Sequence, residues 1–315
     1  MDRSTAAARL KDAARRAGFD LAGVAALAPA VTAGAYRGWL ARGDHAGMGW
    51  MERNVALRGD PRGLLPGAMS ALVVGLRYAP LVDGEPDGDL WPRVARYARG
   101  RDYHHTLRER LRTVAAEAEA MLPDCRTRVC VDTAPLLERE LAARAGLGAV
   151  GKNTMLLHPE AGSWFLLGEL LLTTELAPDT PLADLCGDCT RCLDACPTGA
   201  LAAPYRLDAR RCLSYWTIEH RGEIPAPMHG HLRDWVFGCD VCQEACPWNR
   251  RVDPIEREEF AVPAGRRALD LAGLLALDRA QYRARLGDSP LQRARLEGLR
   301  RNAGITLARA PAPAR

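Results

Sequence analysis

Cysteine spacing is most informative in the run Cys186-Gly187-Asp188-Cys189-Thr190-Arg191-Cys192-Leu193-Asp194-Ala195-Cys196-Pro197. This C-x2-C-x2-C-x3-C-P pattern is typical of a chain that wraps around a 4Fe-4S cluster. In proteins that hold two clusters, the fourth cysteine of such a run ligates the other cluster. The run therefore predicts an electron-handling domain with two clusters.

A second run with the same ending follows at Cys239-Asp240-Val241-Cys242-Gln243-Glu244-Ala245-Cys246-Pro247, but it has one cysteine fewer. The isolated Cys212 can supply the missing ligand. We therefore expect two interleaved sets, in which each run lends its last cysteine to the other cluster. The first set is Cys186, Cys189, Cys192 and Cys246, and the second set is Cys196, Cys212, Cys239 and Cys242.

Cysteines in such runs can also bind structural zinc or form disulfides. Structural zinc would need tetrahedral sets of four ligands and would leave the paired C-x3-C-P endings without a role. Disulfides are disfavoured because a chain of 315 residues has its own core and shows no apolar signal segment after Met1. Cys125 and Cys130 lie outside both sets, and we expect them to pack as small apolar residues.

The bulk composition predicts a cytoplasmic protein without membrane association. The chain is 48% apolar, enough to fill the cores of two or three domains, and its longest apolar stretch, 164–172, is too short to cross a bilayer. The net charge of +4 does not by itself indicate nucleic acid. Arginines crowd the region 279–301, where they form either an ordinary solvated helix face or a contact surface for a polyanion.

The first half is predicted to have an α/β or α+β fold, and the whole chain to have three parts. Amphipathic helices and buried strands alternate there, with helices at 5–17, 106–121 and 136–145 and strands at 21–25, 71–77 and 128–133. The apolar segment up to Leu172 is expected to add strands to the same sheet. The parts are an α/β catalytic domain at 1–175, a ferredoxin-type domain at 176–255, and a helical region at 256–315 with helices at 269–277 and 289–307 and a disordered tail.

The glycine-rich stretch Gly146-Leu147-Gly148-Ala149-Val150-Gly151-Lys152-Asn153 is neither a dinucleotide fingerprint nor a phosphate loop. It follows a predicted helix, whereas a dinucleotide fingerprint follows a strand and opens a helix. Asn153 stands where a phosphate loop needs Ser or Thr. Gly146 suits a helix cap, and the other glycines either make tight turns or line the wall of a large cofactor.

Three motifs in this order resemble a known enzyme family. They are Val131-Asp132-Thr133-Ala134-Pro135-Leu136-Leu137-Glu138-Arg139, the segment from Gly146 to Thr154, and Cys212-Leu213-Ser214-Tyr215-Trp216-Thr217-Ile218-Glu219. Together with the cysteine runs they resemble the epoxyqueuosine reductases, cobalamin-dependent iron–sulfur enzymes of tRNA modification, from about residue 10 to about residue 307. The chain departs from some relatives because it stops near residue 315, without a C-terminal helical-repeat extension.

The resemblance implies reduction of epoxyqueuosine to queuosine at the wobble position of tRNA, with the epoxide oxygen leaving as water. Two 4Fe-4S clusters would relay electrons from a low-potential donor to cobalamin, whose Co(I) state can attack an epoxide carbon. The general acid would be Asp132, whose pKa we expect a dry, apolar site to raise. The alternative is that Asp132 or Thr133 only caps the following helix. We expect a monomer.

The same resemblance suggests which residues surround cobalamin. Ser214 and the segment from Leu156 to Leu167 match corrin-contacting positions, and Tyr103 either lines the pocket or packs in the core. His104 and His105 are expected to face solvent, so cobalt is left without a protein histidine ligand. The expected contacts are Tyr103, Asp132, Gly148, Gly151, Lys152, Asn153, Leu156, Leu167 and Ser214.

The arginines of the last helix are expected to follow tRNA phosphates, while the unstacked wobble nucleotide enters the cofactor pocket. Two competing functions stay open. A reductive dehalogenase also couples a corrinoid to two clusters, but the twin-arginine leader typical of that class is not seen, because Arg15 and Arg16 lie in an amphipathic helix. A ferredoxin-type electron carrier would explain the cysteines but leave the Val-Asp-Thr and Gly-Lys-Asn segments without a role.

Overall fold

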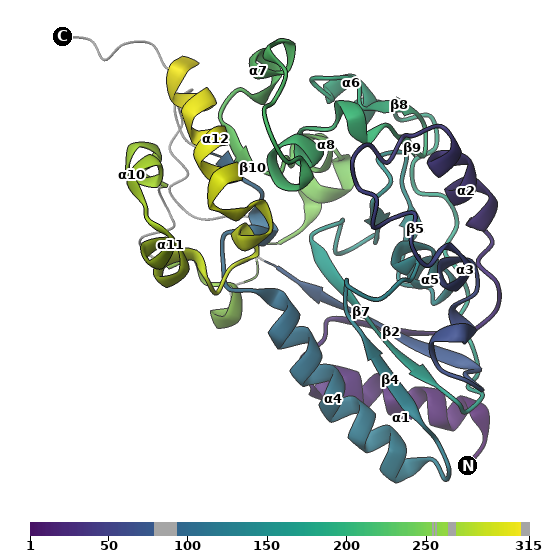
Figure 1. Ribbon diagram of the computed structural model, residues 1–315. Coiled ribbons are helices and arrows are strands. Elements are labelled where there is room, and N and C mark those ends of the chain that lie inside the picture. Colours follow the sequence, from purple (N-terminus) through teal and green to yellow (C-terminus); the bar gives the residue numbers. More distant parts are fainter. Residues whose placement is uncertain (79–92, 254, 256, 264–268, 310–315) are drawn as a thin grey trace.

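A four-stranded sheet lies at the centre of the N-terminal half. The structure is a computed structural model that describes residues 1–78, 93–253, 255, 257–263 and 269–309 (Figure 1). The sheet has the order β1–β2–β7–β4, with every neighbouring pair antiparallel. Its strands are β1 (Leu21–Ala26), β2 (Ser70–Arg77), β7 (Phe165–Leu172) and β4 (Thr127–Cys130). This sheet is therefore antiparallel, which agrees with the α+β form of the prediction for the N-terminal half.

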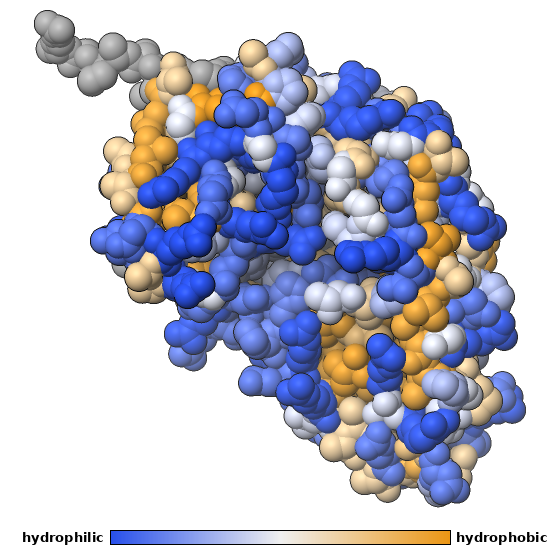
Figure 2. Space-filling view, viewed as in Figure 1, coloured by the Kyte–Doolittle hydropathy of each residue, from blue (hydrophilic) through white to orange (hydrophobic). Residues whose placement is uncertain are grey.

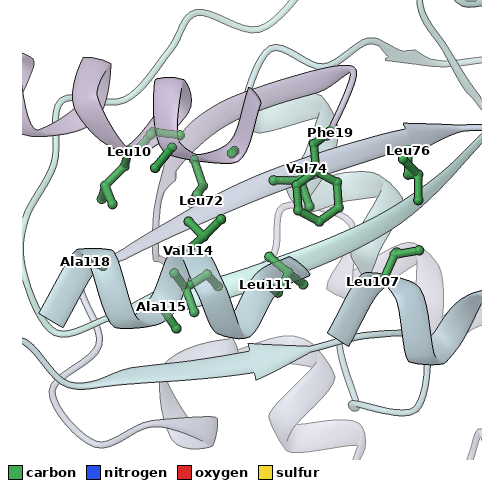
Figure 3. Packing of buried hydrophobic residues seen from close by; sticks show 14 of the residues in the cluster. Leu10, Phe19, Leu72, Val74, Leu76, Leu107, Leu111, Val114, Ala115 and Ala118 are labelled. Atoms are coloured by element: carbon green, nitrogen blue, oxygen red, sulfur yellow. The ribbon is translucent and has the colours of Figure 1, made fainter. Parts of the chain in front are cut away.

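The strand β2 is apolar on both faces because helices cover the sheet from both sides. Leu72 and Val74 point toward α1 (Arg3–Arg16) and α4 (Tyr103–Met121), where they pack with residues such as Leu10 and Leu111 (Figure 3). Val73, between them in sequence, belongs to the opposite core beside α5 (Glu138–Arg144). Each fully buried Leu or Val side chain stabilises the fold by about 1.5–3 kcal/mol.

Aspartates mark the starts of both long helices. The side chain of Asp2 accepts hydrogen bonds from the backbone N–H groups of Ser4 and Thr5 at the start of α1. Asp102 accepts one from His104 in the same way, so α4 begins at Tyr103 rather than at the expected Thr106. This earlier start places Tyr103 and His104 in the first turn of α4, and the site described below depends on it.

The connection between β4 and α5 is longer than the sequence suggests. The strand ends at Cys130 instead of Thr133, and the helix begins at Glu138 instead of Leu136. The loop between them holds Asp132 at a φ of 53°, a left-handed conformation that Asp adopts more readily than most residues. Gly146, at a φ of 75°, follows the end of α5 as the predicted cap.

The cysteine-rich region consists of short elements joined by loops, and it packs beside the sheet domain in Figure 1. A small hairpin from the sheet domain reaches toward it, formed by β5 (Ala149–Val150) and β6 (Leu156–Leu157). The other elements are α6 (Arg191–Ala195), β8 (Leu201–Ala203), β9 (Arg206–Leu207), η3 (Ala209–Arg211), the π-helix η4 (Tyr215–Glu219), α7 (Ala226–Leu232), β10 (Trp235–Phe237), α8 (Val241–Glu244) and η5 (Pro247–Arg251).

The remaining helices lie in two places. Those before residue 100 are α2 (Ala33–Ala41), α3 (Val55–Gly59), η1 (Pro61–Leu64) and η2 (Arg96–Ala98), and the late ones are η6 (Glu258–Phe260), α10 (Leu271–Ala276), α11 (Arg279–Leu286), η7 (Pro290–Ala294) and α12 (Arg295–Arg309). The late helices α10 and α12 share a core with β10 and with β3 (Arg93–Val94), which pairs with β10 in parallel. Packing therefore crosses the predicted limits at residues 175 and 255, and the three-part division stays a prediction.

The C-terminal end of the chain differs from its prediction. The helix expected at 289–307 is split into η7 and α12, and α12 continues to Arg309. The rest of the expected disordered tail, 310–315, lies outside the described residues. Among the helices that the structure describes, none has the length and apolar character needed to span a bilayer.

Candidate active site and cluster sites

The thiols of the first predicted set line one small cavity. Its walls include Lys152 and Trp248 together with Cys186, Cys189, Cys192 and Cys246. Burial raises the pKa of Cys192, and the nearby thiols of Cys186 and Cys246 raise it further. Four thiols around one enclosed space are the donor set that a 4Fe-4S cube takes.

The thiols of the second predicted set also lie together. Burial raises the pKa of Cys242 well above that of a free thiol, and the thiols of Cys239, Cys212 and Cys196 add to this effect. The pKa of Cys239 rises to about 12, again by burial first and then through Cys212 and Cys196. Since thiolates are the ligands of iron, cluster binding here must release these protons. All ten cysteines are free of disulfides.

Two residues expected to touch cobalamin, Lys152 and Asn153, also hold the cysteine loops. Nζ of Lys152 donates to the backbone carbonyl oxygens of Gly187 at 2.6 Å and Cys189 at 3.1 Å, both in the first run. Nδ2 of Asn153 donates to the carbonyl oxygen of Cys242 at 3.4 Å, in the second run. The Gly-Lys-Asn turn thus ties the sheet domain to both cluster loops.

The neighbouring glycines are required by their own hairpin. A Cβ at Gly148 would lie 2.3 Å from the carbonyl oxygen of Leu157, and a Cβ at Gly151 would lie 2.7 Å from the side chain of the same leucine. This favours the tight-turn interpretation over a cofactor wall. Leu156 is buried in the core beside α5, and Leu167 is half-buried against that core.

Ser214 lies beside the second cysteine set. Burial raises the pKa of Cys212, while a hydrogen bond from Ser214 lowers it. The π-helix η4 starts directly after Ser214, and such single π-turns are frequent at functional sites. Ser214 is therefore placed to act on Cys212, a member of the second set.

The polar centre of the site is an Asp–His–Asp chain. Nε2 of His104 lies 2.8 Å from Oδ2 of Asp132, and its Nδ1 lies 2.6 Å from Oδ1 of Asp102. Burial lowers the pKa of His104, but the two carboxylates outweigh burial and raise it to about 9. His104 is therefore an imidazolium at neutral pH. The expectation that it faces solvent is wrong, whereas His105 is exposed.

Sequence reasoning could have found His104. The triplet Asp102-Tyr103-His104 stands at the start of a helix, where an N-cap aspartate accepts the N–H two residues further along. The same carboxylate is then close enough to bind the ring of His104 as well. An N-cap Asp followed by His at this spacing is thus a local signal for an oriented imidazole.

The pKa of Asp132 is lowered, which contradicts the expectation of a raised value. Burial does raise it, but the hydrogen bond and positive charge of His104, the charge of Arg293 and a hydrogen bond from Tyr103 together outweigh burial. Tyr103 also stacks on His104, with ring centroids 4.2 Å apart. The proton that these two groups share is therefore held on His104, and Asp132 is a carboxylate rather than a neutral carboxylic acid.

Asp132 does not cap α5. The N-cap position of that helix is Leu137, and the backbone N–H of Asp132 itself donates to Oε1 of Glu138 at 2.8 Å. Thr133 directs its hydroxyl to the carbonyl oxygen of Val131 at 3.3 Å. The carboxylate of Asp132 is thus left to bind His104 and whatever occupies the adjacent space.

The space beside Asp132 is recessed. The side chain of Asp132 is 54% exposed although protein surrounds it on most sides. Burial lowers the pKa of Arg139, and the opposing charges that act on it come from Glu138, Cys242 and Asp132. Arg139 therefore lies near enough to both Asp132 and Cys242 for the charge of each to act on it. We call the recess beside Asp132 and Arg139 the hollow, and Figure 2 shows the face recessed between the sheet domain and the lobe of α10–α12.

Several C-terminal arginines are used to hold the fold together. Arg301 donates to the carbonyl oxygens of Trp216, His220 and Gly222, and Arg300 donates to that of Leu277. These two side chains in α12 are therefore not free to follow phosphates as expected. Exposed arginines instead line a groove of about 700 Å³ between α11 and α12, and they are Arg279, Arg283 and Arg295.

Comparisons with known proteins agree with this geometry. The model of the 4Fe-4S double cluster binding domain matches residues 185–249, and the model described as epoxyqueuosine reductase QueG, DUF1730, matches residues 58–133. An epoxyqueuosine reductase from Xanthomonas campestris is 42% identical over 98% of this chain and 88% of its own length. One from Synechococcus sp. (strain RCC307) is 47% identical over 76% of this chain and 74% of its own length.

Solved structures give the same result. The crystal structure of an epoxyqueuosine reductase with an epoxyqueuosine-modified tRNA-Tyr stem loop matches with a TM-score of 0.90 and 31% identity, over 96% of this chain and 80% of that one. A catabolic reductive dehalogenase matches with a TM-score of 0.50 and 18% identity, over 96% of this chain and 38% of that one, which is a likeness of fold alone. By its sequence identity over nearly the whole length, this chain belongs to the epoxyqueuosine reductase family.

Proposed function

We propose that this chain reduces epoxyqueuosine in tRNA to queuosine, using two 4Fe-4S clusters and a cobalamin that occupies the hollow between Asp132 and the second cysteine set. The observation that carries the proposal is that Asp132, which contacts the ring of His104 at 2.8 Å, and Cys242 of the second cysteine set both act on the side chain of Arg139. Relatives named for this activity, and a similar structure that holds a modified tRNA stem loop, support the choice of substrate.

The two cysteine sets have different surroundings, which suggests the direction of electron flow. In the first run, Gly187 and Asp188 are exposed, so a cluster there lies near the protein surface. In the second set, Cys242 acts on Arg139 at the hollow. When bound, the clusters would supply one-electron transfer from a low-potential donor, with Cys186, Cys189, Cys192 and Cys246 holding the one nearer the surface and Cys196, Cys212, Cys239 and Cys242 the one nearer the hollow.

The hollow has the chemistry expected of a cobalamin site. It is lined by both polar and charged groups, and Asp132 and Arg139 are exposed to it while protein encloses them. When bound, cobalamin supplies a reduced cobalt that can act as a nucleophile toward an epoxide carbon. Asp132 and Arg139 would lie beside it on the sheet-domain side, and Ser214 on the side of the second cluster.

The pair of Asp132 and His104 would protonate the epoxide oxygen. Opening the ring develops negative charge on that oxygen, and a proton donor within hydrogen-bond reach lowers the barrier. His104 keeps its proton at neutral pH, and Asp102 orients its ring. Asp132 points its carboxylate to the hollow and would shuttle the proton from His104 to the substrate.

The groove between α11 and α12 is the proposed tRNA contact. Arg279, Arg283 and Arg295 are exposed there, and phosphate contacts of this kind position an RNA without reading its sequence. Arg293, in η7, binds Glu219 through two nitrogens at 2.8 and 2.9 Å and also acts on Asp132. It therefore stands between the groove and the active site, where the unstacked nucleotide would pass.

Anaerobic turnover tests the proposal directly. Protein with reconstituted clusters is mixed with epoxyqueuosine-containing tRNA and a low-potential reductant, with and without cobalamin, and the nucleosides are read by mass spectrometry. Formation of queuosine only with cobalamin supports the function. Protein that holds both clusters and cobalamin but leaves the nucleoside unchanged contradicts it, and protein that binds no cobalamin at all would be an electron carrier.

A further inference from the structure

Glu169 is a buried acid in the middle of the sheet. It lies in β7, is fully enclosed, and has no hydrogen-bond partner for either carboxylate oxygen among the described residues. It stands directly across from Cys130 of β4, so the two side chains are on the same face of the sheet, which α5 covers. An unpaired charge is strongly disfavoured in such a place, so Glu169 stays protonated.

Glu138 connects this buried acid with the active site. It is the first residue of α5, and its Oε1 accepts the backbone N–H of Asp132 at 2.8 Å. Burial, together with the charge of Asp132, raises its pKa to about 7. Burial raises the pKa of Glu169 more strongly, and Glu138 is the largest of the charges that add to it. Glu138 thus contacts the backbone of Asp132, Asp132 contacts His104, and Glu169 lies deeper in the sheet, across from Cys130.

We propose that Glu138 and Glu169 store the second proton of each turnover behind Asp132, and that Glu138 delivers it. This inference rests on the proposed function. Removing an epoxide oxygen as water breaks two C–O bonds, forms one C=C bond and consumes two electrons and two protons. The electrons come from the low-potential donor through the clusters. His104 holds one proton, and a second is needed to turn the departing hydroxide into water.

The groups around the two acids set how firmly Glu138 holds its proton. The positive charge of His104 lowers the pKa of Glu138, and Oε1 of Glu138 accepts the backbone N–H of Asp132. Its neighbours differ in their effect, since Arg139 lowers the pKa of Glu138 while Asp132 raises it. The titratable and charged groups that face the two acids are Asp132, His104, Arg139 and Cys130, whose own pKa is raised to about 12 by burial and by Glu169.

The kinetic test uses the enzyme loaded with clusters and cobalamin. Glu138→Gln keeps the size of the side chain but carries no exchangeable acid, so multiple-turnover rates fall by on the order of a hundredfold. The wild-type rate falls as the pH rises through about 7, where Glu138 loses its proton, and the variant lacks this step. A small carboxylic acid such as formic acid restores part of the lost rate. Wild-type rate and pH profile in Glu138→Gln would overturn the proposal.

The matched control is Glu140→Gln on the same helix. Glu140 pairs with Arg144 at 3.7 Å and accepts the backbone N–H of Val31, away from the active site. Its variant is expected to keep the wild-type rate and pH profile. A loss of rate in Glu140→Gln equal to that in Glu138→Gln would show that charge removal anywhere on α5 is sufficient, and would also overturn the proposal.

A second measurement needs no substrate and so separates this inference from the proposed function. Infrared difference spectroscopy on the folded protein at neutral pH is expected to show the carbonyl band of a protonated, buried carboxylic acid that disappears in Glu169→Gln. If the spectrum of Glu169→Gln equals that of the wild type, the proton store does not exist. If the band is present but the wild-type enzyme fails to turn over, the store stands and the proposed reaction fails.

Discussion

Nε2 of His104 lies 2.8 Å from Oδ2 of Asp132, and this contact decides where the proton of the active site is held. An isolated aspartate in a partly buried site would keep the proton itself. Here the imidazole takes it, because a second carboxylate, Asp102, binds the other ring nitrogen at 2.6 Å. The proposed catalytic acid is therefore a charge-paired unit in which His104 comes from α4 and Asp132 comes from the loop after β4.

The pH dependence of stability reports on this pair. The folded pKa of His104, about 9, lies above its unfolded value of 6.5, so its stabilising effect is complete below pH 6.5 and is lost as the pH rises through about 9. We expect the free energy of unfolding of wild type and His104→Gln to differ by about 2 kcal/mol more at pH 6 than at pH 10. Denaturant unfolding at both pH values measures this. The control is His105→Gln at the exposed neighbour, and a pH-independent difference for His104→Gln would contradict the assignment.

Removal of the carboxylate at Asp132 is expected to stop the reaction without unfolding the protein. Asp132→Asn retains the left-handed backbone, which Asn adopts readily, and lowers the rate by on the order of a hundredfold or more. The control is Asp124→Asn, since Asp124 is also at positive φ, 57°, but is exposed on a loop remote from the hollow. Queuosine formation, iron content and bound cobalamin are measured for both. Full activity in Asp132→Asn would end its role.

The interleaving of the cysteine sets can be tested by combining substitutions. Cys189→Ser alone is expected to lower the iron content from about eight to about four atoms per chain. Cys189→Ser combined with Cys246→Ser stays at about four, because both cysteines belong to the first set, whereas Cys189→Ser with Cys242→Ser loses both clusters. A near-complete loss of iron in the Cys189/Cys246 double variant would show that each run binds its own cluster.

Lys152 is expected to protect the first cluster. Lys152→Met keeps the aliphatic stem but removes the donor to the carbonyl oxygens of Gly187 and Cys189, so the loop of the first cluster loosens. We expect severalfold faster loss of one cluster in air, read from the visible absorbance and the iron content, with the second cluster unaffected. Lys11→Met, which breaks the distant ion pair with Asp179, is the control and should match the wild type.

Two arginines that line the groove, Arg283 and Arg301, should behave differently because only Arg301 is bound to several backbone carbonyl oxygens. Arg283→Gln is expected to weaken binding of a tRNA stem loop and to reduce the salt slope of log affinity by about 1, since one phosphate contact is lost. Arg301→Gln leaves several backbone carbonyl oxygens without their donor and should lower thermal stability. Binding titrations at several salt concentrations and thermal melts compare the two variants. An unchanged salt slope in Arg283→Gln would remove the groove as the RNA contact.

Sequence alone determined the features that depend on spacing along the chain. The C-x2-C-x2-C-x3-C-P run predicts clusters because ligands so close in sequence must meet around one centre. The strand at 71–77 and the helix ending at Met121 follow from local apolar patterns, and Gly146 as a cap follows from its backbone freedom. The family resemblance, carried by short motifs in a fixed order, is confirmed by the comparisons.

Only the tertiary structure decided the chemistry of the active site, because a pKa depends on groups that meet through space. Asp132 was expected to be a neutral acid, but His104, from a helix distant in sequence, makes it a carboxylate. Arg300 carries the same charge as Arg283, yet one satisfies a backbone carbonyl oxygen and the other faces a groove. The pattern of charges in a sequence does not reveal which partners burial brings together, and that is what sets the role of each of these residues.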